Sequence, residues 1–245
     1  MDLAIEGRVA LVTGASKGLG FAVARALAGE GAKVAISSRS RERIDAAAAR
    51  IGASGFVHDA SEPDAVDALV GRVEAELGPI DILVANSGGP PTPRELLTPE
   101  PAQWHAAHEM LLLGQLVLIG AVVRGMRERR WGRVLSLSSS VVREPNAKLV
   151  LSSSYRGALL AALKTIAGDV ARDAVTVNTL LTGVIATDRA RELGVDSPES
   201  ISNIPMGRVG TVEEFGATAA FLCSEPAAYI TGTALLIDGG ASRAV

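Results

Sequence analysis

The sequence contains few of the residues that build a disulfide framework or a structural zinc site. Its 245 residues include one cysteine, Cys223, and three histidines, at positions 58, 105 and 108. A single cysteine cannot form an internal disulfide, and three scattered histidines do not have the ligand spacing of a structural zinc site. The sequence therefore predicts a metal-free protein of the cytoplasm.

The chain also lacks an excess of basic charge. It carries 24 Lys and Arg against 27 Asp and Glu, which gives a net charge of −3 and a pI of about 5.7. A protein that binds nucleic acid needs cations to neutralise phosphates, so nucleic acid is not an expected partner.

Long hydrophobic runs are missing as well. The most apolar run, residues 111–123, is interrupted by Gln115 and by two glycines, and it is shorter than the roughly 18 residues of a membrane span. Residues 1–6 include acids and no basic region ahead of an apolar stretch, unlike a signal peptide. We expect a buried helix at 111–123 and no membrane partner.

What the chain does have is the composition of a folded globular protein. Hydrophobic residues make up 48% and charged residues 21%, and the length is sufficient for one large α/β domain. Short β-branched runs alternate with longer stretches of helical periodicity, which is typical of parallel strands joined by helical crossovers. The expected strands are residues 9–13, 33–37, 55–57, 80–85, 134–137, 175–180 and 234–237. The expected helices are residues 18–29, 40–51, 62–77, 101–129, 152–172 and 211–223. No linker divides the chain, so we expect residues 1–245 to form a single-domain, doubly wound parallel sheet (Rossmann-like) with helices on both faces.

A glycine-rich turn follows the first expected strand and leads directly into a helix. It reads Thr13-Gly14-Ala15-Ser16-Lys17-Gly18-Leu19-Gly20. Glycines let the backbone turn tightly and approach a pyrophosphate, whose charge is favoured at a helix N-terminus. The alternative is a tight turn without a ligand. The predicted cofactor-binding residues of this turn are Gly14, Ser16, Lys17, Gly18, Leu19 and Gly20.

The end of the second strand indicates which dinucleotide binds. An NAD site usually has an acid there for the ribose 2′-hydroxyl, but this chain has Ser38 and Arg39. Together with Lys17, these residues are suited to a 2′-phosphate. Alternatively, Arg39 is only the solvated start of the next helix. The sequence thus predicts NADP(H), with NAD(H) less favoured.

Several motifs together resemble the short-chain dehydrogenase/reductase family, especially its 3-oxoacyl-ACP reductases. They are the glycine turn, Asp59 after the third strand, the segment Asp81-Ile-Leu-Val-Ala-Asn-Ser-Gly-Gly89 and the closing Ile237-Asp-Gly-Gly240. The resemblance implies that Asp59 holds the adenine, although an acid there also suits a helix cap. It further implies that Asn86, Gly88 and Thr187 lie along the cofactor, with a lid over residues 187–205. A small-molecule carbonyl or acyl substrate and a homo-oligomer (tetramer or dimer) are also implied.

The family's catalytic residues are Asn, Ser, Tyr and Lys, the last two as Tyr-x-x-x-Lys. Tyr155 is followed four residues later by Leu159, which cannot replace the lysine. Aligning the helix through Lys164 instead puts Ser152 at the position of the tyrosine and Arg156 at that of the lysine. The same alignment puts Ser139 on the catalytic serine and Leu111 on the asparagine.

Ser139, Ser152 and Arg156 are therefore the catalytic candidates. Ser152 and Arg156 share one helix face, but a serine hydroxyl is a far weaker acid than a phenol and arginine stays protonated. Alternative roles are a turn for Ser139 and an ion pair with Asp169 for Arg156. Alternative proton sources are Tyr155, Lys148, Arg143 and His108.

Two functions remain open at this point. The first is an NADP(H)-dependent oxidoreductase that interconverts a carbonyl and a hydroxyl with an altered catalytic tetrad. The second is an NADP(H)-binding protein without redox turnover, acting as a sensor or partner subunit.

Overall fold

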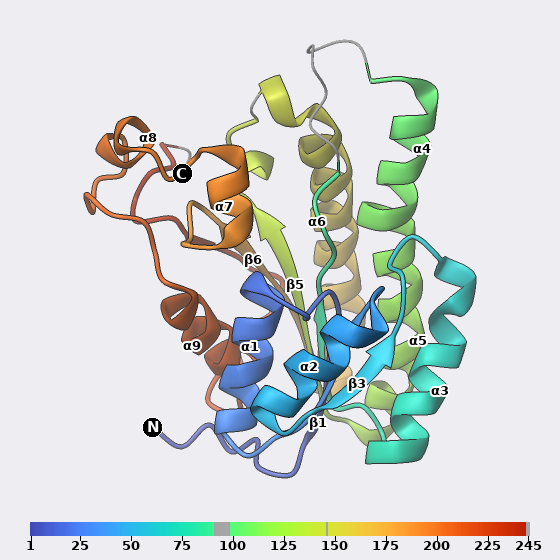
Figure 1. Ribbon diagram of the computed structural model, residues 1–245. Coiled ribbons are helices and arrows are strands. Elements are labelled where there is room, and N and C mark those ends of the chain that lie inside the picture. Colours follow the sequence, from blue (N-terminus) through green and yellow to red (C-terminus); the bar gives the residue numbers. More distant parts are fainter. Residues whose placement is uncertain (91–98, 146, 244–245) are drawn as a thin grey trace.

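Parallel strands form one seven-stranded sheet in the computed structural model, which describes residues 1–90, 99–145 and 147–243 (Figure 1). The strand order is β3-β2-β1-β4-β5-β6-β7 and each pair is parallel. The strands are β1 (Val9–Val12), β2 (Lys33–Ser38), β3 (Ser54–Val57), β4 (Ile82–Ala85), β5 (Gly132–Ser139), β6 (Val175–Thr182) and β7 (Ala234–Ile237). The predicted doubly wound parallel sheet is confirmed.

Helices cover both faces of the sheet. They are α1 (Gly18–Gly29), α2 (Arg41–Ile51), α3 (Val66–Leu77), α4 (Pro101–His108), α5 (Gly114–Arg129), α6 (Val150–Val170), α7 (Asp188–Leu193), α8 (Pro198–Ser202) and α9 (Val212–Leu222). One hydrophobic cluster joins the sheet to α1, α2 and α9, and a second joins it to α3, α5 and α6. Figure 1 shows these two layers on opposite sides of the strands. Burial on both faces explains why the strands are almost continuously apolar.

Local sequence signals set the ends of several helices. Ser40 caps α2 by accepting a hydrogen bond from the Arg43 backbone N–H, and Gly52 ends it in the left-handed region at φ +66°. Thr211 and Glu214 form a reciprocal capping box at the start of α9. These contacts explain why the sequence predicts the ends of α2 and α9 to within one residue, whereas α3 begins at Val66, four residues after its expected start, behind a 3-10 turn at Pro63–Ala65.

The expected helix over residues 101–129 is interrupted. Between α4 and α5 lies a π-helical segment, Glu109–Leu113, where the Gly114 backbone N–H donates to the Glu109 carbonyl five residues earlier. The segment at 187–205, where no helix was expected, contains the short helices α7 and α8. The remaining expected helices are present, with short 3-10 turns at the ends of α3 and α6.

Among the described residues, one stretch passes a test for a membrane helix by length and composition alone. This stretch, Pro101–Arg129, contains an 18-residue window with a mean hydropathy of 1.8. Leu118, Val122 and Met126 on its α5 part are buried in the cluster that joins α5 to the sheet. We therefore interpret it as a core helix of the domain, as the sequence analysis predicted for residues 111–123.

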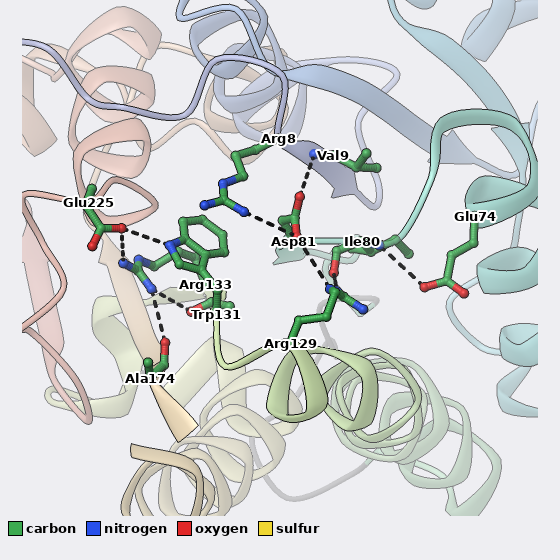
Figure 2. A network of polar contacts seen from close by, with 11 residues as sticks. Arg8, Val9, Glu74, Ile80, Asp81, Arg129, Trp131, Arg133, Ala174 and Glu225 are labelled. Carbon is green, nitrogen blue, oxygen red and sulfur yellow. Dashed lines mark hydrogen bonds and ion pairs between the residues drawn. The ribbon is translucent and has the colours of Figure 1, made fainter. Parts of the chain in front are cut away.

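A polar network ties the strands together at their amino ends (Figure 2). The Trp131 ring lies between two guanidinium groups, 3.9 Å from Arg8 and 4.4 Å from Arg133. Arg133 is 2% exposed and donates to Glu225 at 3.1 Å, and Glu225 also accepts from the Trp131 indole at 2.8 Å. Asp81 accepts a hydrogen bond from the Val9 backbone at 3.2 Å. The polar groups at the amino ends of the strands therefore bond to one another. In a sheet of this kind ligands bind at the opposite edge, at the carboxyl ends of the strands.

Candidate functional site

The glycine turn lies at the carboxyl ends of the neighbouring strands β1 and β4. The strand order switches between these two strands, and ligands bind at such a switch. Gly14 and Gly18 have φ values of +59° and +63°, which other residues adopt only with strain. A Cβ on Gly20 would lie 2.7 Å from the Gly14 carbonyl oxygen, so the helix can approach the turn only without a side chain there. Ser16 and Leu19 are partly buried in this turn. The N-terminus of α1 thereby opens directly onto the turn.

Asn86, predicted to lie along the cofactor, fixes the turn to β4. Its backbone N–H donates to the Thr13 hydroxyl at 2.9 Å, and that hydroxyl donates to the Asn86 carbonyl at 2.7 Å. The Asn86 amide donates to the carbonyls of Thr13 and Gly14 at 3.2 and 3.1 Å. Gly88 is exposed two residues further on. Asn86 therefore positions the turn rather than reaching out of it.

Arg39 lines a cavity of about 270 Å³ beside the end of β2. Arg72 from α3 and His58, Asp59 and Glu62 from the segment after β3 line the same cavity. Two guanidinium groups around one hollow suit a phosphate. Ser38 is partly buried at the end of β2, and its hydroxyl makes a long hydrogen bond, 3.5 Å, to the Ser40 carbonyl.

One carboxylate oxygen of Asp59 holds the turn that follows β3. Its Oδ1 accepts hydrogen bonds from the Ser61 backbone and hydroxyl at 3.0 and 2.8 Å, whereas its Oδ2 accepts none from the described residues. Burial raises the pKa of Asp59, but the bonds from Ser61 and the charge of Arg39 outweigh it, so the pKa is below its ordinary value. Asp59 is an ionised acceptor with one oxygen available to a ligand.

Lys17 lies at a different cavity from Arg39. It lines a hollow of about 260 Å³ together with Gly18, Thr187 and Arg191, and its ammonium is 3.8 Å from Glu192 on α7. Thr187 caps α7 by accepting from the Ala190 backbone N–H at 3.2 Å. The structure thus places Lys17 with the segment after β6, in a different hollow from the one that Arg39 lines.

Ser152 and Arg156 meet at the carboxyl end of β5. The Arg156 Nε donates to the Ser152 hydroxyl oxygen at 3.1 Å, and its Nη1 donates to the Leu137 carbonyl at 3.0 Å. Ser152 is 7% exposed, and burial lowers the pKa of Arg156 to about 10, so the guanidinium remains charged at neutral pH. Asp169, offered as an alternative partner, is paired with Arg127 at 2.9 Å.

Ser139 is the last residue of β5 and is partly buried. Its hydroxyl oxygen accepts a hydrogen bond of 3.4 Å from the Val141 backbone N–H. The expected strand ended at Leu137, but β5 continues to Ser139, so Ser139 lies on the same extended strand as Leu137, whose carbonyl Arg156 contacts. Turn formation and ligand binding are compatible here, since the hydroxyl proton is not used by the Val141 bond.

Tyr155 occupies a separate aromatic cluster. Its ring meets Trp104 at 5.9 Å and His108 at 5.7 Å between centroids, both edge-on. Both partners belong to α4, so Tyr155 packs α6 against α4, while Arg156, which bonds to Ser152, contacts β5. His108, another alternative proton source, is in the same cluster. Arg143 and Lys148 are exposed between β5 and α6.

We expect Tyr155→Phe to leave any turnover within a few-fold of the parent, because a group outside the proton path adds little to the chemical step. Phenylalanine keeps both ring contacts, so folding is preserved. Steady-state kinetics and a parallel cofactor titration measure the effect. A fall in kcat by two decades or more, with cofactor affinity kept, would show that this phenol is catalytic.

Leu111 lies in the π-helical segment, buried at 1% exposure beside Ala107 and Leu151. The next helix begins very close to the loop after β3, where a Cβ on Gly114 would be 2.2 Å from the Ala60 carbonyl oxygen. π segments often occur at functional sites. This contact joins the helix that carries Leu111 to the loop that carries Asp59.

The fold and these contacts can be compared with known proteins. A family model described as enoyl-(acyl carrier protein) reductase matches residues 14–242, nearly the whole chain. The chain belongs to the short-chain dehydrogenase/reductase family. The family resemblance predicted from the motifs is confirmed.

Other short-chain dehydrogenase/reductases match along their full length. The 3-oxoacyl-[acyl-carrier-protein] reductase FabG of Escherichia coli (strain K12) is 35% identical over 238 residues, 96% of this chain and 97% of the relative. YwfH, an NADPH-dependent reductase involved in bacilysin biosynthesis, superposes with a TM-score of 0.92 at 30% identity, over 97% of this chain and 99% of that one. L-sorbose reductase from Gluconobacter frateurii, complexed with NADPH and L-sorbose, gives a TM-score of 0.91 at 30% identity over 100% of both chains.

Sequence reasoning missed two features of this short-chain dehydrogenase/reductase site. Arg72 lines the cavity of Arg39, but it is on α3, more than 30 residues along the chain, and only the three-dimensional fold brings the two arginines together. Glu192 pairs with Lys17 from α7. A signal for α8 was present, since Ser197-Pro198 is a typical helix start and Ser197 accepts from the Ser200 N–H.

Proposed function

We propose that this protein is an NADP(H)-dependent oxidoreductase that interconverts a carbonyl and a hydroxyl with an altered catalytic set. Ser139, Ser152 and Arg156 form this set, and the usual asparagine, tyrosine and lysine positions are taken by Leu111, Ser152 and Arg156. The observation that carries the proposal is the pair of hydrogen bonds from Arg156 to Ser152 and to Leu137, at the carboxyl end of β5.

The residues present fit NADP(H). Nothing lies within 4 Å of a Cβ built on Gly18, so the N-terminus of α1 is open to a pyrophosphate. The cavity of Arg39 and Arg72 supplies positive charge for a 2′-phosphate, and Asp59 keeps one carboxylate oxygen for the adenine amino group. The E. coli relative and the NADPH-bound neighbour support this cofactor.

NADPH, when bound, supplies a hydride to the carbonyl carbon. The protein's task is to stabilise the negative charge that then develops on the carbonyl oxygen. The hydroxyls of Ser139 and Ser152 are donors to that oxygen, and the Arg156 charge adds electrostatic stabilisation in a partly dry site.

The proton that completes the alcohol comes from solvent in this scheme. A serine hydroxyl does not ionise near neutral pH, and Arg156 with a pKa of about 10 keeps its proton there. Ser152 can relay a proton from water by exchanging its own. The reaction would therefore proceed without a phenol acid, and slowly compared with an enzyme that has one.

Arg39→Ala tests the cofactor assignment. We expect the affinity for NADPH to fall by about 10- to 100-fold while NADH binding is almost unchanged, since one charge-assisted contact contributes roughly 1.5–3 kcal/mol. Calorimetric titration of both nucleotides measures this. Arg43→Ala is the matched control, because Arg43 is an exposed arginine four residues after Arg39, at the start of α2, and does not line the cavity. Tighter binding of NADH than of NADPH by the parent would refute the assignment.

A second candidate function is NADP(H) binding without turnover, as a sensor or partner subunit. It is favoured by one observation: the tyrosine of α6 is packed against Trp104 and His108, away from Arg156. NADPH consumption with a panel of ketones separates the two candidates. Cofactor binding without any consumption would support the sensor.

Three further parts belong to this proposal. Residues 187–205, with α7 and α8, are the lid over the substrate. The protein works as a homo-oligomer in the cytoplasm, and Leu113 at the end of the π-helical segment and Val117 on α5, which are 37% and 36% exposed, are available to a second copy. A small-molecule carbonyl or acyl compound is the substrate.

A further inference from the structure

Arg156 is a charged group without a counter-ion. Among the described residues no carboxylate forms an ion pair with it, and its polar partners are a hydroxyl and a backbone carbonyl. Asp169 on the same helix is engaged by Arg127. The residue is only partly exposed, so water compensates the charge poorly.

The guanidinium also keeps unused donors. It has five N–H groups, and its two hydrogen bonds come from Nε and Nη1, so Nη2 donates to no group of the described chain. Ser152 accepts through its oxygen, which leaves its O–H to donate elsewhere. Ser139 likewise accepts from Val141 and keeps its own proton.

The three side chains therefore present donors and one positive charge. A neutral ketone oxygen needs one or two donors, whereas a carboxylate accepts several and pairs with a guanidinium. A charge buried without a partner costs free energy, and an anionic ligand would remove that cost when it binds.

The phosphates of the cofactor are expected elsewhere. The glycine turn opens onto the pyrophosphate position, and Arg39 with Arg72 lines the cavity assigned to the 2′-phosphate. Arg156 reaches from α6 to the carboxyl end of β5, and it lines neither the cavity of Arg39 nor the hollow of Lys17. Its unused donors are left for the second substrate.

We propose that the substrate of this site carries a carboxylate, which Arg156 binds through its unused Nη2 donors while the Ser152 hydroxyl stays with the carbonyl oxygen, so that the substrate class is small keto acids or hydroxy acids rather than neutral acyl thioesters. This inference rests on the proposed function, because it names the substrate of the same site.

The experiment compares keto acids with their own methyl esters. Pyruvate, acetoacetate and levulinate are each assayed with NADPH against the corresponding methyl ester and against an acetoacetyl thioester. We expect kcat/KM for at least one acid to exceed that of its ester by about 10- to 100-fold, the worth of a charge-assisted contact. In Arg156→Met this ratio should approach one. Equal or better reduction of the esters and thioester by the parent would overturn the proposal.

A binding measurement keeps the inference testable if turnover is absent. The same keto acids are titrated calorimetrically into the NADP⁺ complex of the parent and of Arg156→Met. Binding by the parent and a loss of at least about 10-fold in the variant support the proposal. If no acid binds the complex, if the variant binds equally well, or if the acid competes with NADP⁺, Arg156 does not hold a substrate carboxylate. Absence of turnover with carboxylate binding intact would refute only the oxidoreductase function.

Two controls accompany these measurements. Arg143→Met removes an exposed cation from the segment after β5 and should leave the acid-to-ester ratio unchanged. Thermal unfolding separates a binding role from a structural one. Arg156→Met leaves the Leu137 carbonyl and the Ser152 oxygen without this donor, so a modest fall in Tm is expected without ligand. The keto acid should raise the Tm of the parent and not that of Arg156→Met, and an equal rise in both would mean that Arg156 does not bind the carboxylate.

Discussion

Reduction of a neutral ketone ester by NADPH is expected to accelerate by about 10²- to 10⁴-fold when Leu111→Asn, Ser152→Tyr and Arg156→Lys are combined, which is the usual worth of general acid catalysis. Ser152 and Arg156 already face each other, with Nε and Oγ 3.1 Å apart. A tyrosine and a lysine at these positions would therefore be neighbours, and the ammonium would lower the phenol pKa toward the working pH. Steady-state rates with a β-ketoacyl ester measure the gain.

The sign of the change separates a lost catalytic set from a rebuilt one. Ser152 is 7% exposed, so a tyrosine there also risks overpacking, which costs about 1–3 kcal/mol. Ser152→Tyr alone, with Arg156 kept, is the control for crowding, because it adds the ring without restoring the lysine. A fall from a measurable parental rate in the triple variant would contradict the expectation and indicate a site adapted to serine and arginine. If neither protein turns over while NADPH still binds, the function without turnover is the one that holds.

Gly114→Ala is expected to destabilise the fold by about 1–3 kcal/mol, although alanine is normally the better helix former. The new Cβ would be 2.2 Å from the Ala60 carbonyl oxygen, a backbone atom that can move only with its loop. Because Asp59 precedes Ala60, affinity for NADPH should fall together with stability. Urea unfolding and cofactor titration measure the two effects.

Gly120→Ala provides a control of opposite sign on the same helix. Gly120 is exposed, and a Cβ built there has nothing within 4 Å. The substitution should stabilise the protein by about 0.5–1 kcal/mol through helix propensity alone. Equal effects of the two substitutions would mean that the approach of α5 to Ala60 has no energetic importance.

The sequence was sufficient for the sheet because its signals are local. Most strands are short runs rich in apolar and β-branched residues, and the glycine turn at Gly14, Gly18 and Gly20 has the spacing that the strand–turn–helix geometry requires. The shared helix face of Ser152 and Arg156 also follows from their spacing alone. Their hydrogen bond confirms that they meet.

Other parts depended on contacts between distant segments. The ion pair of Lys17 with Glu192 depends on where α7 lies, and α7 is far along the chain from the glycine turn. The interruption of the helix at Glu109–Leu113 accompanies the approach of Gly114 to Ala60, more than 50 residues earlier. Helical periodicity within one segment contains no information on either contact.

The π-helical segment also sets the angular phase between α4 and α5. One residue advances an α-helix by about 100°, so the additional residue in this wide turn rotates α4 by that angle relative to an uninterrupted α-helix. The two consecutive helices therefore present different faces to the rest of the domain. On α4, Trp104 and His108 contact Tyr155, whereas on α5 Leu118 packs against the sheet. Loss of a single residue between 109 and 113 would leave every side chain of α4 present and turn its aromatic face away from α6. In this part of the chain, one deletion would alter more contacts than most substitutions.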